Sequence, residues 1–510
     1  GANFTEIKLG ILKRESVNEM VSDLLLQSPQ QTQPLADLIH NKTGGNAYYV
    51  IQFLQSLEAD GLLQYSFAKK RWLWYLERIQ AIEMNDNAVE LVKERLLKLD
   101  PDVVETVKVV SCFGADCEEH VMRLAFKSRL EGDQCMERML RHLDLAVSEG
   151  ILCKSDTKFS FSHYQLQSAA YSLMSAEELK ILHLKIGQTI LSNSDHDALG
   201  GFVFTVADQL RRGLSLVTDD TKRYQLAEEI FLRAGTKAMN STLFSQALVY
   251  FRQGIELLGV DHWITHYQLS LKLYSNCVLT QFVSGETKGL ETTAKNVLEH
   301  ARSLPDKLCV YFVLTSSFGV RGMYTTSLSY GFKALSLLGE YFVMQPDPEY
   351  VFAEYRHTNK MLSWDTIESI SALPVMEDEN KCAAMDFMNV VLPYCHQDGQ
   401  FQLVGALVIS RMIRLTLKYG LCKESAVACA SFGALSFMKK LTNDSKHGVA
   451  RASQCGRAAV SIVKRLNARE VLPRVYSIVY SYINPIMQPM QANVESLKIA
   501  YDIALATGNV

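Results

Sequence analysis

The strongest constraint on the fold is a helical pattern that begins near Arg223 and continues almost to the end of the 510-residue chain. Apolar residues recur there at spacings of three and four, which places them on one face of an α-helix. One stripe consists of Phe244, Ala247, Leu248, Phe251, Ile255 and Leu258, and the segment before it carries Leu226, Ile230, Phe231 and Ala234. Two successive amphipathic helices bury their stripes against each other, so the pattern predicts a helix hairpin.

Weaker copies of this hairpin follow at intervals of about 40 residues, which is typical of helical solenoids. They centre on Leu290 and Ala294, on Leu328 and Phe332, and on the stretch "CKESAVACASFGALSFM". The final "ESLKIAYDIALATGN" has the pattern of a first helix without its partner. The span 346–400 is less regular and fits either longer helices or an insertion.

The first hairpin resembles the tetratricopeptide repeat. Phe231, Ala234 and Gly235 stand where that repeat has a large residue, a small residue and glycine, and Ala247-x3-Phe251 matches its second helix. The sequence therefore predicts a mainly α protein whose residues 201–510 form an α-solenoid of tetratricopeptide-like helix hairpins, truncated at its C-terminal end.

The N-terminal part contains the stretch Thr43–Leu57, "TGGNAYYVIQFLQSL", in which two glycines and an asparagine precede an apolar helix. Glycines at a helix N-terminus can hold a phosphate, because backbone N–H groups approach the anion closely. No lysine follows this turn, so an ordinary helix start is the favoured interpretation. "LLQYSFAKKRWLWYL" then predicts a hairpin, in which Trp72 and Trp74 fit packing better than a binding face. We expect short helices and this hairpin over 1–85.

A second helical group is followed by two strand-like pieces, "ILCKS" and "KFSFSHY", and by the helix "QLQSAAYSLM". This order predicts a winged-helix unit over 86–200. Winged helices often bind DNA, and the helix 135–149 is the element to inspect. Its acidic residues Glu137, Asp144 and Glu149 balance Arg138 and Arg141, which disfavours contact with phosphates.

Composition limits the kinds of partner and the cellular location that we expect for this chain. Lys and Arg number 52 against 55 Asp and Glu, so no basic excess points to nucleic acid or to a membrane surface. Eleven cysteines, among them Cys112, Cys277, Cys309 and Cys429, lie singly in apolar contexts, which favours free thiols and a cytoplasmic location. The uncharged run 475–494 contains two prolines and does not predict a membrane span. The chain lacks an initial Met and stops within a helical pattern, so we expect a piece of a longer protein.

Catalytic motifs are absent from the sequence. It contains no GxxxxGK[ST] phosphate loop, no HExxH and no GxSxG, so we expect no catalytic residue, no metal site and no enzyme activity in this fragment. His163 stands at a predicted strand-to-helix junction, where a histidine can contact a phosphate or cap the helix. On residues alone, the cap is the favoured interpretation.

The order of five segments resembles the regulatory ATPase region of large signalling proteins. The segments are "LADLIHNKTGGNAYYVIQFLQSLEADGLLQY", "RWLWYLERIQAI", "NAVELVKERLLKLD", "FSFSHYQLQSAAYSLM" and "LRAGTKAMNSTLFSQALVYFRQGIELLG". That family joins a Ser/Thr-kinase-like domain to an AAA-type ATPase of the STAND class, helical repeats, and often GAF and histidine-kinase or cyclase domains. The resemblance covers about residues 1–340 well and the rest loosely.

The resemblance implies that 1–85 holds the lid helices of the ATPase and that the phosphate-loop core lies outside this chain. It places Gly44, Gly45, Asn46 and His163 near a nucleotide, with ATP or ADP bound only in the full-length parent. Two positions depart from the family pattern. Ala47 replaces the usual proline, and Tyr164 replaces the aspartate of the Ser-His-Asp motif that senses the phosphate.

The function that this resemblance implies is a nucleotide-dependent switch that acts on an output domain, with protein partners bound by the repeats. Adjacent kinase or cyclase domains are the expected outputs; no direct nucleic-acid or membrane contact is expected. Two alternatives remain open. The ATPase region could be degenerate and serve as a scaffold, or the chain could belong to a transcription regulator similar to the maltose activator.

Overall fold

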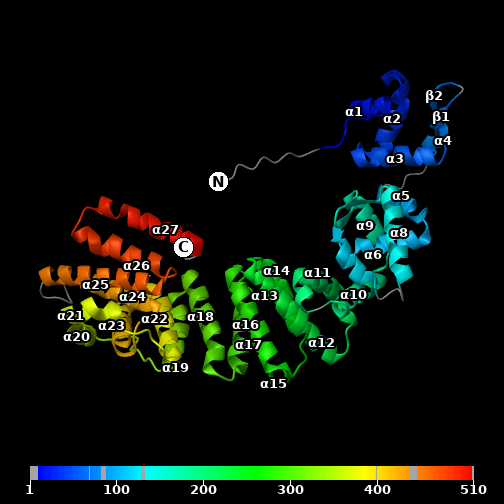
Figure 1. Cartoon of the computed structure of the whole chain (residues 1–510). Coiled ribbons are helices and arrows are strands. Elements are labelled where there is room, and N and C mark those ends of the chain that lie inside the picture. The colour runs from blue at the N-terminus through cyan, green and yellow to red at the C-terminus, as the bar shows by residue number, and fades with distance from the viewer. Residues whose placement is uncertain are drawn as a thin grey trace. The chain divides into compact units, whose positions relative to one another are not determined.

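The structure is a computed structural model that describes residues 10–67, 69–81, 88–127, 133–194, 196–397, 399–436 and 445–507 (Figure 1). By its contacts the chain divides into two compact units, Gly1–Ala234 and Gly235–Val510, which are described separately. The finer boundaries expected near residues 85 and 200 stay predictions.

Unit 1 begins with three helices, a hairpin and a short helix. These are α1 (Arg14–Leu25), α2 (Pro29–Thr43), α3 (Ala47–Ala59), β1 (Leu63–Ser66), β2 (Arg71–Trp74) and α4 (Leu76–Gln80). Val17, Val21 and Leu25 of α1 are buried in their shared core, as the helical spacing predicts. Leu24, next to Leu25, is also apolar but is 58% exposed, because it lies at the edge of the buried face.

The hairpin is antiparallel, with Leu63 opposite Trp74 and Tyr65 opposite Trp72. Both tryptophans are partly buried and pack against the core of α1 to α3. The Tyr65 ring meets Trp72 edge-on at a centroid distance of 5.7 Å. The two indoles therefore act as packing groups, as expected.

The next part of unit 1 joins helices to a small three-stranded antiparallel sheet in the order β3-β5-β4. The elements are α5 (Ala88–Leu97), α6 (Pro101–Ser111), β3 (Asp116–Glu118), α7 (Glu119–Phe126), α8 (Asp133–Ser148), β4 (Leu152–Ser155), β5 (Lys158–Phe161) and α9 (Tyr164–Ser172). β4 and β5 form the wing, and Phe159 and Phe161 point into the core. This arrangement agrees with the predicted winged helix.

The rest of unit 1 is helical. It contains α10 (Ala176–Ser192), α11 (His196–Gly213), the 3-10 turn η1 (Leu214–Leu216), α12 (Asp220–Leu226) and the π-turn η2 (Ala227–Leu232). Ser175 and Glu178 form a reciprocal capping box at the start of α10. Helix α11 bends at Phe202, whose backbone is not helical.

Unit 2 consists of helices paired along the chain, and α13 crosses the boundary between the units. The first group is α13 (Arg233–Asn240), α14 (Phe244–Leu257), α15 (His262–Thr265), α16 (Tyr267–Val283), α17 (Leu290–His300), α18 (Leu304–Val320) and α19 (Tyr324–Leu337). Ala247, Phe251 and Leu328 are fully buried, as predicted. Phe332 is only partly buried and packs at the edge of the core.

The remaining helices lie in the span 346–400, whose structure the sequence did not predict, and in the residues after it. They are α20 (Pro348–Met361), α21 (Trp364–Ser369), η3 (Ile370–Ala372), α22 (Glu379–Gln397), η4 (Gly399–Phe401), α23 (Gln402–Tyr419), α24 (Lys423–Leu435), α25 (Ser445–Leu466), α26 (Leu472–Ile478), η5 (Val479–Ile483), η6 (Asn484–Ile486), η7 (Met490–Asn493) and α27 (Val494–Thr507). The described part of 346–400 is therefore built mainly of helices.

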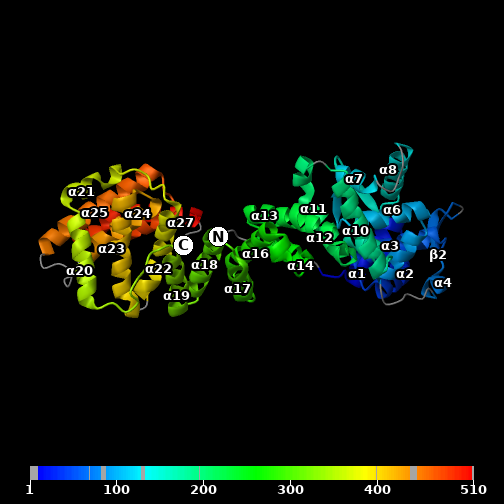
Figure 2. The ribbon, with the colours of Figure 1, turned by 90° about the horizontal axis from the view of Figure 1, so that it is seen from below.

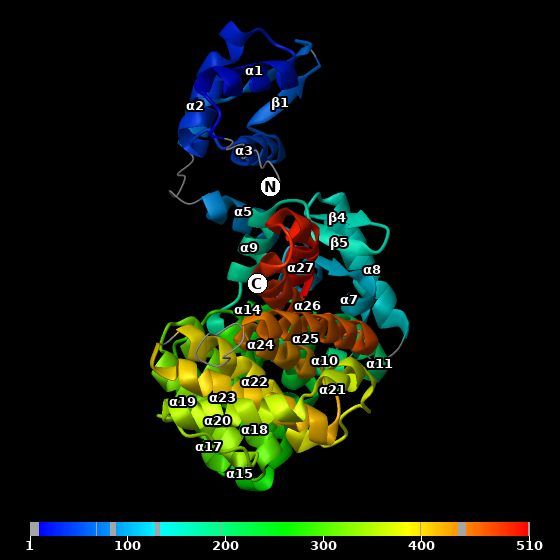
Figure 3. The same cartoon turned by 90° about the vertical axis from the view of Figure 1, so that its left-hand side faces the viewer.

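Helices α22, α23 and α24 run side by side (Figure 2), and α24 packs along α25 (Figure 3). The buried carboxylate of Glu340, just after α19, accepts bonds from Lys381 Nζ at 2.7 Å and from Arg411 Nη1 at 2.6 Å. This ion triad links the end of α19 to α22 and α23. Within the described part of the chain, none of the helices combines the length and apolar character needed to cross a bilayer.

Candidate functional site

The turn before α3 has the geometry of an ordinary helix start. Gly44 ends α2 in the left-handed conformation, and Gly45 also has a positive φ of 74°. The Asn46 side chain then caps α3, because its Oδ1 accepts the backbone N–H groups of Tyr48 at 3.0 Å and of Tyr49 at 3.3 Å. Two of the N–H groups that an anion could use are thus bonded to Asn46.

Gly45 is also needed for packing. Its carbonyl accepts the N–H of Leu12 at 2.7 Å, and His40 Nε2 bonds to the Leu12 carbonyl at 3.1 Å. A Cβ on Gly45 would lie 2.3 Å from the Leu12 oxygen. Close approach of the preceding segment therefore accounts for this glycine without a ligand.

His163 occupies the N-cap position of α9. Its backbone is extended, and its ring Nδ1 accepts the N–H of Gln165 at 3.3 Å. A ring that accepts at Nδ1 carries its proton on Nε2 when neutral. Partial burial lowers the pKa of His163 from its ordinary value of 6.5, which favours this neutral form. His163 therefore combines a cap with an Nε2–H donor.

The structure brings His163 to the start of α3. Its ring stacks on Tyr48, with centroids 3.8 Å apart and planes 8° from parallel. Next to this stack, Gln165 Nε2 donates a hydrogen bond to the Tyr49 hydroxyl. We refer to Tyr48, Tyr49, His163 and Gln165 as the tyrosine–histidine junction. It unites His163 with the helix that Gly44, Gly45 and Asn46 introduce.

Arg95 of α5 strengthens the same connection. Its guanidinium donates to the Gln52 side chain of α3 and, through Nη2, to the Glu149 carbonyl at 2.7 Å. Nearby, Lys98 Nζ lies 3.1 Å from Asp60 Oδ1, between two exposed side chains. The contacts from α3 to the winged helix thus combine one aromatic stack with polar bonds.

Two polar atoms in the junction are buried and have no hydrogen-bond partner among the described residues, namely Tyr48 Oη and Gln165 Oε1. Burial raises the pKa of Tyr48 to about 12, although Arg95 opposes the shift. Buried polar atoms normally have a hydrogen-bond partner. These two atoms without one mark a place where a water molecule, a ligand or a different side-chain arrangement could supply the missing hydrogen bonds. Tyr48, Tyr49, Gln165 and Arg95 were not among the site residues predicted from the sequence; the adjacent tyrosines after "TGGN" were the available signal.

Helix α8 keeps the charge balance expected from its sequence. Glu137, Arg138, Arg141 and Asp144 are all exposed. Lys154 of the wing lies 3.8 Å from Asp144, so the positive charge of the wing is partly paired. The described part of this surface therefore carries charges of both signs.

A cavity of about 630 Å³ lies in unit 1 beside the bend of α11 at Phe202. Charged residues on its wall pair with each other: His120 Nδ1 is 3.1 Å from Glu118 Oε2, and Lys158 Nζ is 3.8 Å from Asp116 Oδ2. Both carboxylates of the wall, Asp116 and Glu118, are therefore already paired with a neighbouring side chain.

Among the residues that the structure describes, no three His, Cys, Asp or Glu side chains converge on a possible metal position. The ten cysteines with described side chains are free thiols. Burial raises the pKa of Cys395 and Cys455 to about 12, so these thiols are inert rather than nucleophilic.

The sequence of this chain is similar to part of one known signalling protein. No family model matches the chain. Over 361 residues it is 27% identical to the hybrid signal transduction histidine kinase G of Dictyostelium discoideum, a match that covers 59% of this chain and 10% of that protein. The match thus takes in about a tenth of the relative's length.

Among solved structures, the chain is similar to a Signal Transduction ATPase with Numerous Domains (STAND) protein with a tetratricopeptide repeat sensor from Pyrococcus horikoshii. The TM-score is 0.29 and the identity 12%, over 98% of this chain and 67% of that one. The sequence match confirms the resemblance to signalling kinases: this chain is similar to a segment of a hybrid signal transduction histidine kinase.

Proposed function

We propose that this chain is a regulatory and protein-interaction segment of a STAND-type signalling ATPase, and that it transmits the nucleotide state of a core outside the chain to an output domain. Similarity to a signal transduction histidine kinase supports a role in signalling. The paired helices of unit 2 support binding of protein partners. Kinase or cyclase domains of the parent are the proposed outputs.

The observation that carries the proposal is the stack of His163 on Tyr48. It joins the winged helix to the first turn of α3 through a side chain whose Nε2–H can bind a phosphate oxygen. A hydrogen bond to a charged group is worth about 1.5–3 kcal/mol. An aromatic stack adds about 0.5–1.5 kcal/mol beyond its burial. The stack uses the face of the ring and the Nε2–H lies in its plane, so a phosphate that accepts the Nε2–H bond would add to the stack and favour the stacked state of the junction over an unstacked one.

The test is ADP binding by the full-length parent carrying His163→Ala. We expect affinity to fall by roughly tenfold, the lower end of the range for one charge-assisted bond, because Tyr164 has no carboxylate to orient the ring. His163→Asn separates the two roles of the histidine: asparagine restores a good N-cap but not the Nε2–H donor. His357→Ala, which removes an exposed histidine of α20, is the matched control.

Loss of ADP affinity in both His163 variants, with the His357 variant unchanged, would support phosphate contact. Recovery in His163→Asn would reduce His163 to a capping residue. Unchanged affinity in His163→Ala would remove the nucleotide role altogether.

A second candidate, a scaffold with a degenerate ATPase, is favoured by the bonding of the "TGGN" turn. The Asn46 cap already binds the N–H groups of Tyr48 and Tyr49, and Leu12 packs on Gly45. Ala47 and Tyr164 depart from the family pattern at the same two places. A parent that captures protein partners equally well with and without ADP would favour the scaffold over the switch.

A further inference from the structure

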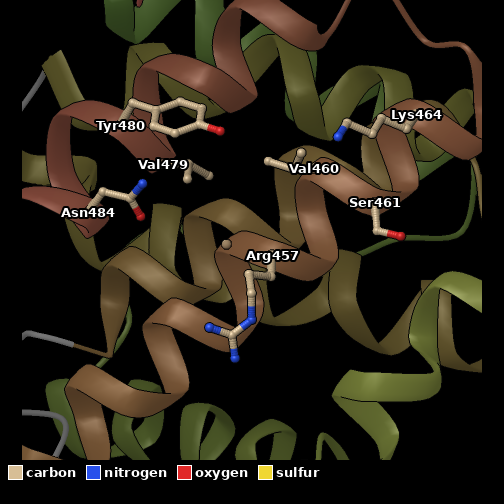
Figure 4. A pocket seen from close by; sticks show the side chains of 8 residues that line it. Arg457, Val460, Ser461, Lys464, Val479, Tyr480 and Asn484 are labelled. Carbon is tan, nitrogen blue, oxygen red and sulfur yellow. The ribbon is translucent and has the colours of Figure 1, made fainter. Parts of the chain in front are cut away.

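A pocket of about 290 Å³ lies in unit 2 between α25 and the turns that follow α26 (Figure 4). One wall is the exposed side of α25, with Arg457, Ser461 and Lys464. The opposite wall comes from the π-turn η5 and from η6, with Tyr480 and Asn484. The pocket is thus lined by two cations on the α25 side and by the Tyr480 hydroxyl and the Asn484 amide on the other.

The charge of this region differs from that of the whole chain. Between Arg451 and Arg474 there are six basic residues and one acidic residue, Glu470, whereas the chain has a net charge of −3. None of the eight described residues that line the pocket is acidic. Its electrostatic potential therefore favours an anionic occupant.

Several of these cations have structural partners. Arg451, Arg465 and Arg474 donate to the backbone carbonyls of Leu362 at 2.9 Å, Leu373 at 2.7 Å and Asn389 at 2.6 Å, respectively. They hold α25 and α26 against neighbouring helices. Arg457 instead donates to the neutral hydroxyl of Ser453 at 2.9 Å, which leaves its charge uncompensated in that contact. Of the six basic residues between Arg451 and Arg474, Arg457 and Lys464 are the two that line the pocket.

The spacing of the two cations distinguishes between anions. Arg457 and Lys464 are seven residues apart on α25, so their Cα atoms are separated by roughly 10 Å along the helix axis. In Figure 4 the guanidinium and the amine point in different directions and do not converge on one point. Two acidic side chains three residues apart in an extended polyproline II segment lie on the same side and span a similar distance of about 9 Å, since that helix has three residues per turn. The arrangement suits an extended segment with two negative charges better than a single phosphate.

We propose that this pocket binds an acidic, extended peptide segment of a protein partner. Arg457 and Lys464 pair with its carboxylates, and Tyr480 and Asn484 bond to its backbone. The π-turn makes this wall possible, because its wider turn changes the direction of the side chains that follow. The inference deepens the proposed protein-interaction role and rests on it.

The probe is fluorescently labelled octaglutamate, and the measurement is its anisotropy with the whole 510-residue chain at low ionic strength. The test variant carries Arg457→Glu and Lys464→Glu. The matched control carries Lys272→Glu and Lys333→Glu, which change the charge equally at exposed sites on α16 and α19. Thermal melting confirms that both variants fold. We expect the test variant to bind at least tenfold more weakly and the control to stay within about twofold of the wild-type chain.

Equal losses in the two variants would overturn the proposal, since they would show general charge attraction. No binding by the wild-type chain would overturn it as well. Inorganic phosphate is added as a competitor: displacement of the probe by phosphate alone, at concentrations where free glutamate has no effect, would indicate a phosphate site instead. No nucleotide is present, so failure here is distinct from failure of the ADP experiment.

Discussion

A Cβ atom on Gly235 would lie 2.5 Å from Cε1 of Phe251. The first helix of this pair therefore approaches the second so closely that only glycine fits beneath the phenyl ring. Phe251 is fully buried. The contact explains why the sequence places a glycine directly after Ala234, in a helix where alanine would otherwise be favoured.

Gly235→Ala should destabilise unit 2 by about 1–3 kcal/mol, because the added methyl group forces the phenyl ring or the helix to move. Gly456→Ala is the matched helical control, since its Cβ would meet neighbours only at 3.5 Å or more. The free energy of unfolding in urea measures both. A Gly235 variant as stable as the control would show that α13 and α14 can move apart without a loss of unfolding free energy.

Phe251→Ala removes the ring itself and should cost roughly 3–5 kcal/mol, the range for a fully buried aromatic side chain. Ile264→Ala, at a position 75% exposed, should change stability by less than about 0.5 kcal/mol. Denaturant melts of the two variants make the comparison. Similar small changes at both sites would contradict the buried role of Phe251.

The apolar spacing predicted these helices well, because burial at every third or fourth residue is a local property of the sequence. Phe251 and Leu328 are buried as their stripes indicate. The edge of a buried face was harder to predict, as Leu24 shows: it lies next to buried Leu25 but is exposed, because apolar spacing does not reveal how wide the covered face is.

The candidate site was predictable only in part. The order of strand and helix placed His163 at a junction, and the family resemblance linked it to the "TGGN" turn. Its stacking partner Tyr48 lies 115 positions earlier in the chain, and spacing along one helix cannot reveal a contact between distant helices. The pocket beside η5 could not be predicted for a related reason: it depends on a π-turn, and apolar spacing does not indicate where a π-turn occurs.

Acidification should weaken unit 1 through His183. Its Nδ1 bonds to Gln209 Oε1 at 2.6 Å, and its Nε2 accepts the Tyr171 hydroxyl at 2.9 Å, so the folded protein needs the neutral ring. Burial, aided by the Arg212 charge, lowers the pKa of His183 from 6.5. The unfolded chain then binds more protons below about pH 6.5, and stability falls as the pH drops through that range.

The expected measurement is a loss of unfolding free energy between about pH 6.5 and pH 5 that is smaller in His183→Gln. Exposed His357→Gln serves as the control. An NMR titration of His183 with a midpoint above 6.5 would contradict the assignment of a neutral buried ring.

Glu424 should produce the opposite trend in unit 2. Burial and the neighbouring Asp386 carboxyl raise the pKa of Glu424 to about 8, even though Lys423 Nζ lies 3.7 Å away. Between about pH 4.5 and pH 8 the folded state keeps a proton that the unfolded chain releases, so this contribution to stability is lost as the pH rises.

Glu424→Gln should therefore raise the melting temperature at pH 8 relative to the wild-type chain, with a smaller gain at pH 5. Glu495→Gln, at an exposed side chain of α27, provides the comparison. A gain that is equal at both pH values would mean that ionisation of Glu424 is not its cause.

The purified 510-residue chain should release no phosphate from ATP above a buffer blank, because it lacks the lysine-containing loop that binds the β- and γ-phosphates. Phosphate release across the fractions of a sizing column is the measurement. Activity that follows the protein peak at constant specific rate would overturn this expectation, whereas activity in other fractions would identify a contaminant.

The two π-turns, Ala227–Leu232 and Val479–Ile483, also affect how related chains should be compared. A π-turn carries one residue more than the α-turn it replaces, so it is the mark of a single-residue insertion absorbed by a helix. Residues after each turn are rotated by about 100° relative to an uninterrupted helix. In an ungapped alignment of the repeats, buried positions after each π-turn would be matched with exposed ones, and a one-residue gap at each turn would bring them back into register. Homologues lacking that residue should have uniform α-helices and, after the second turn, a differently shaped wall opposite α25.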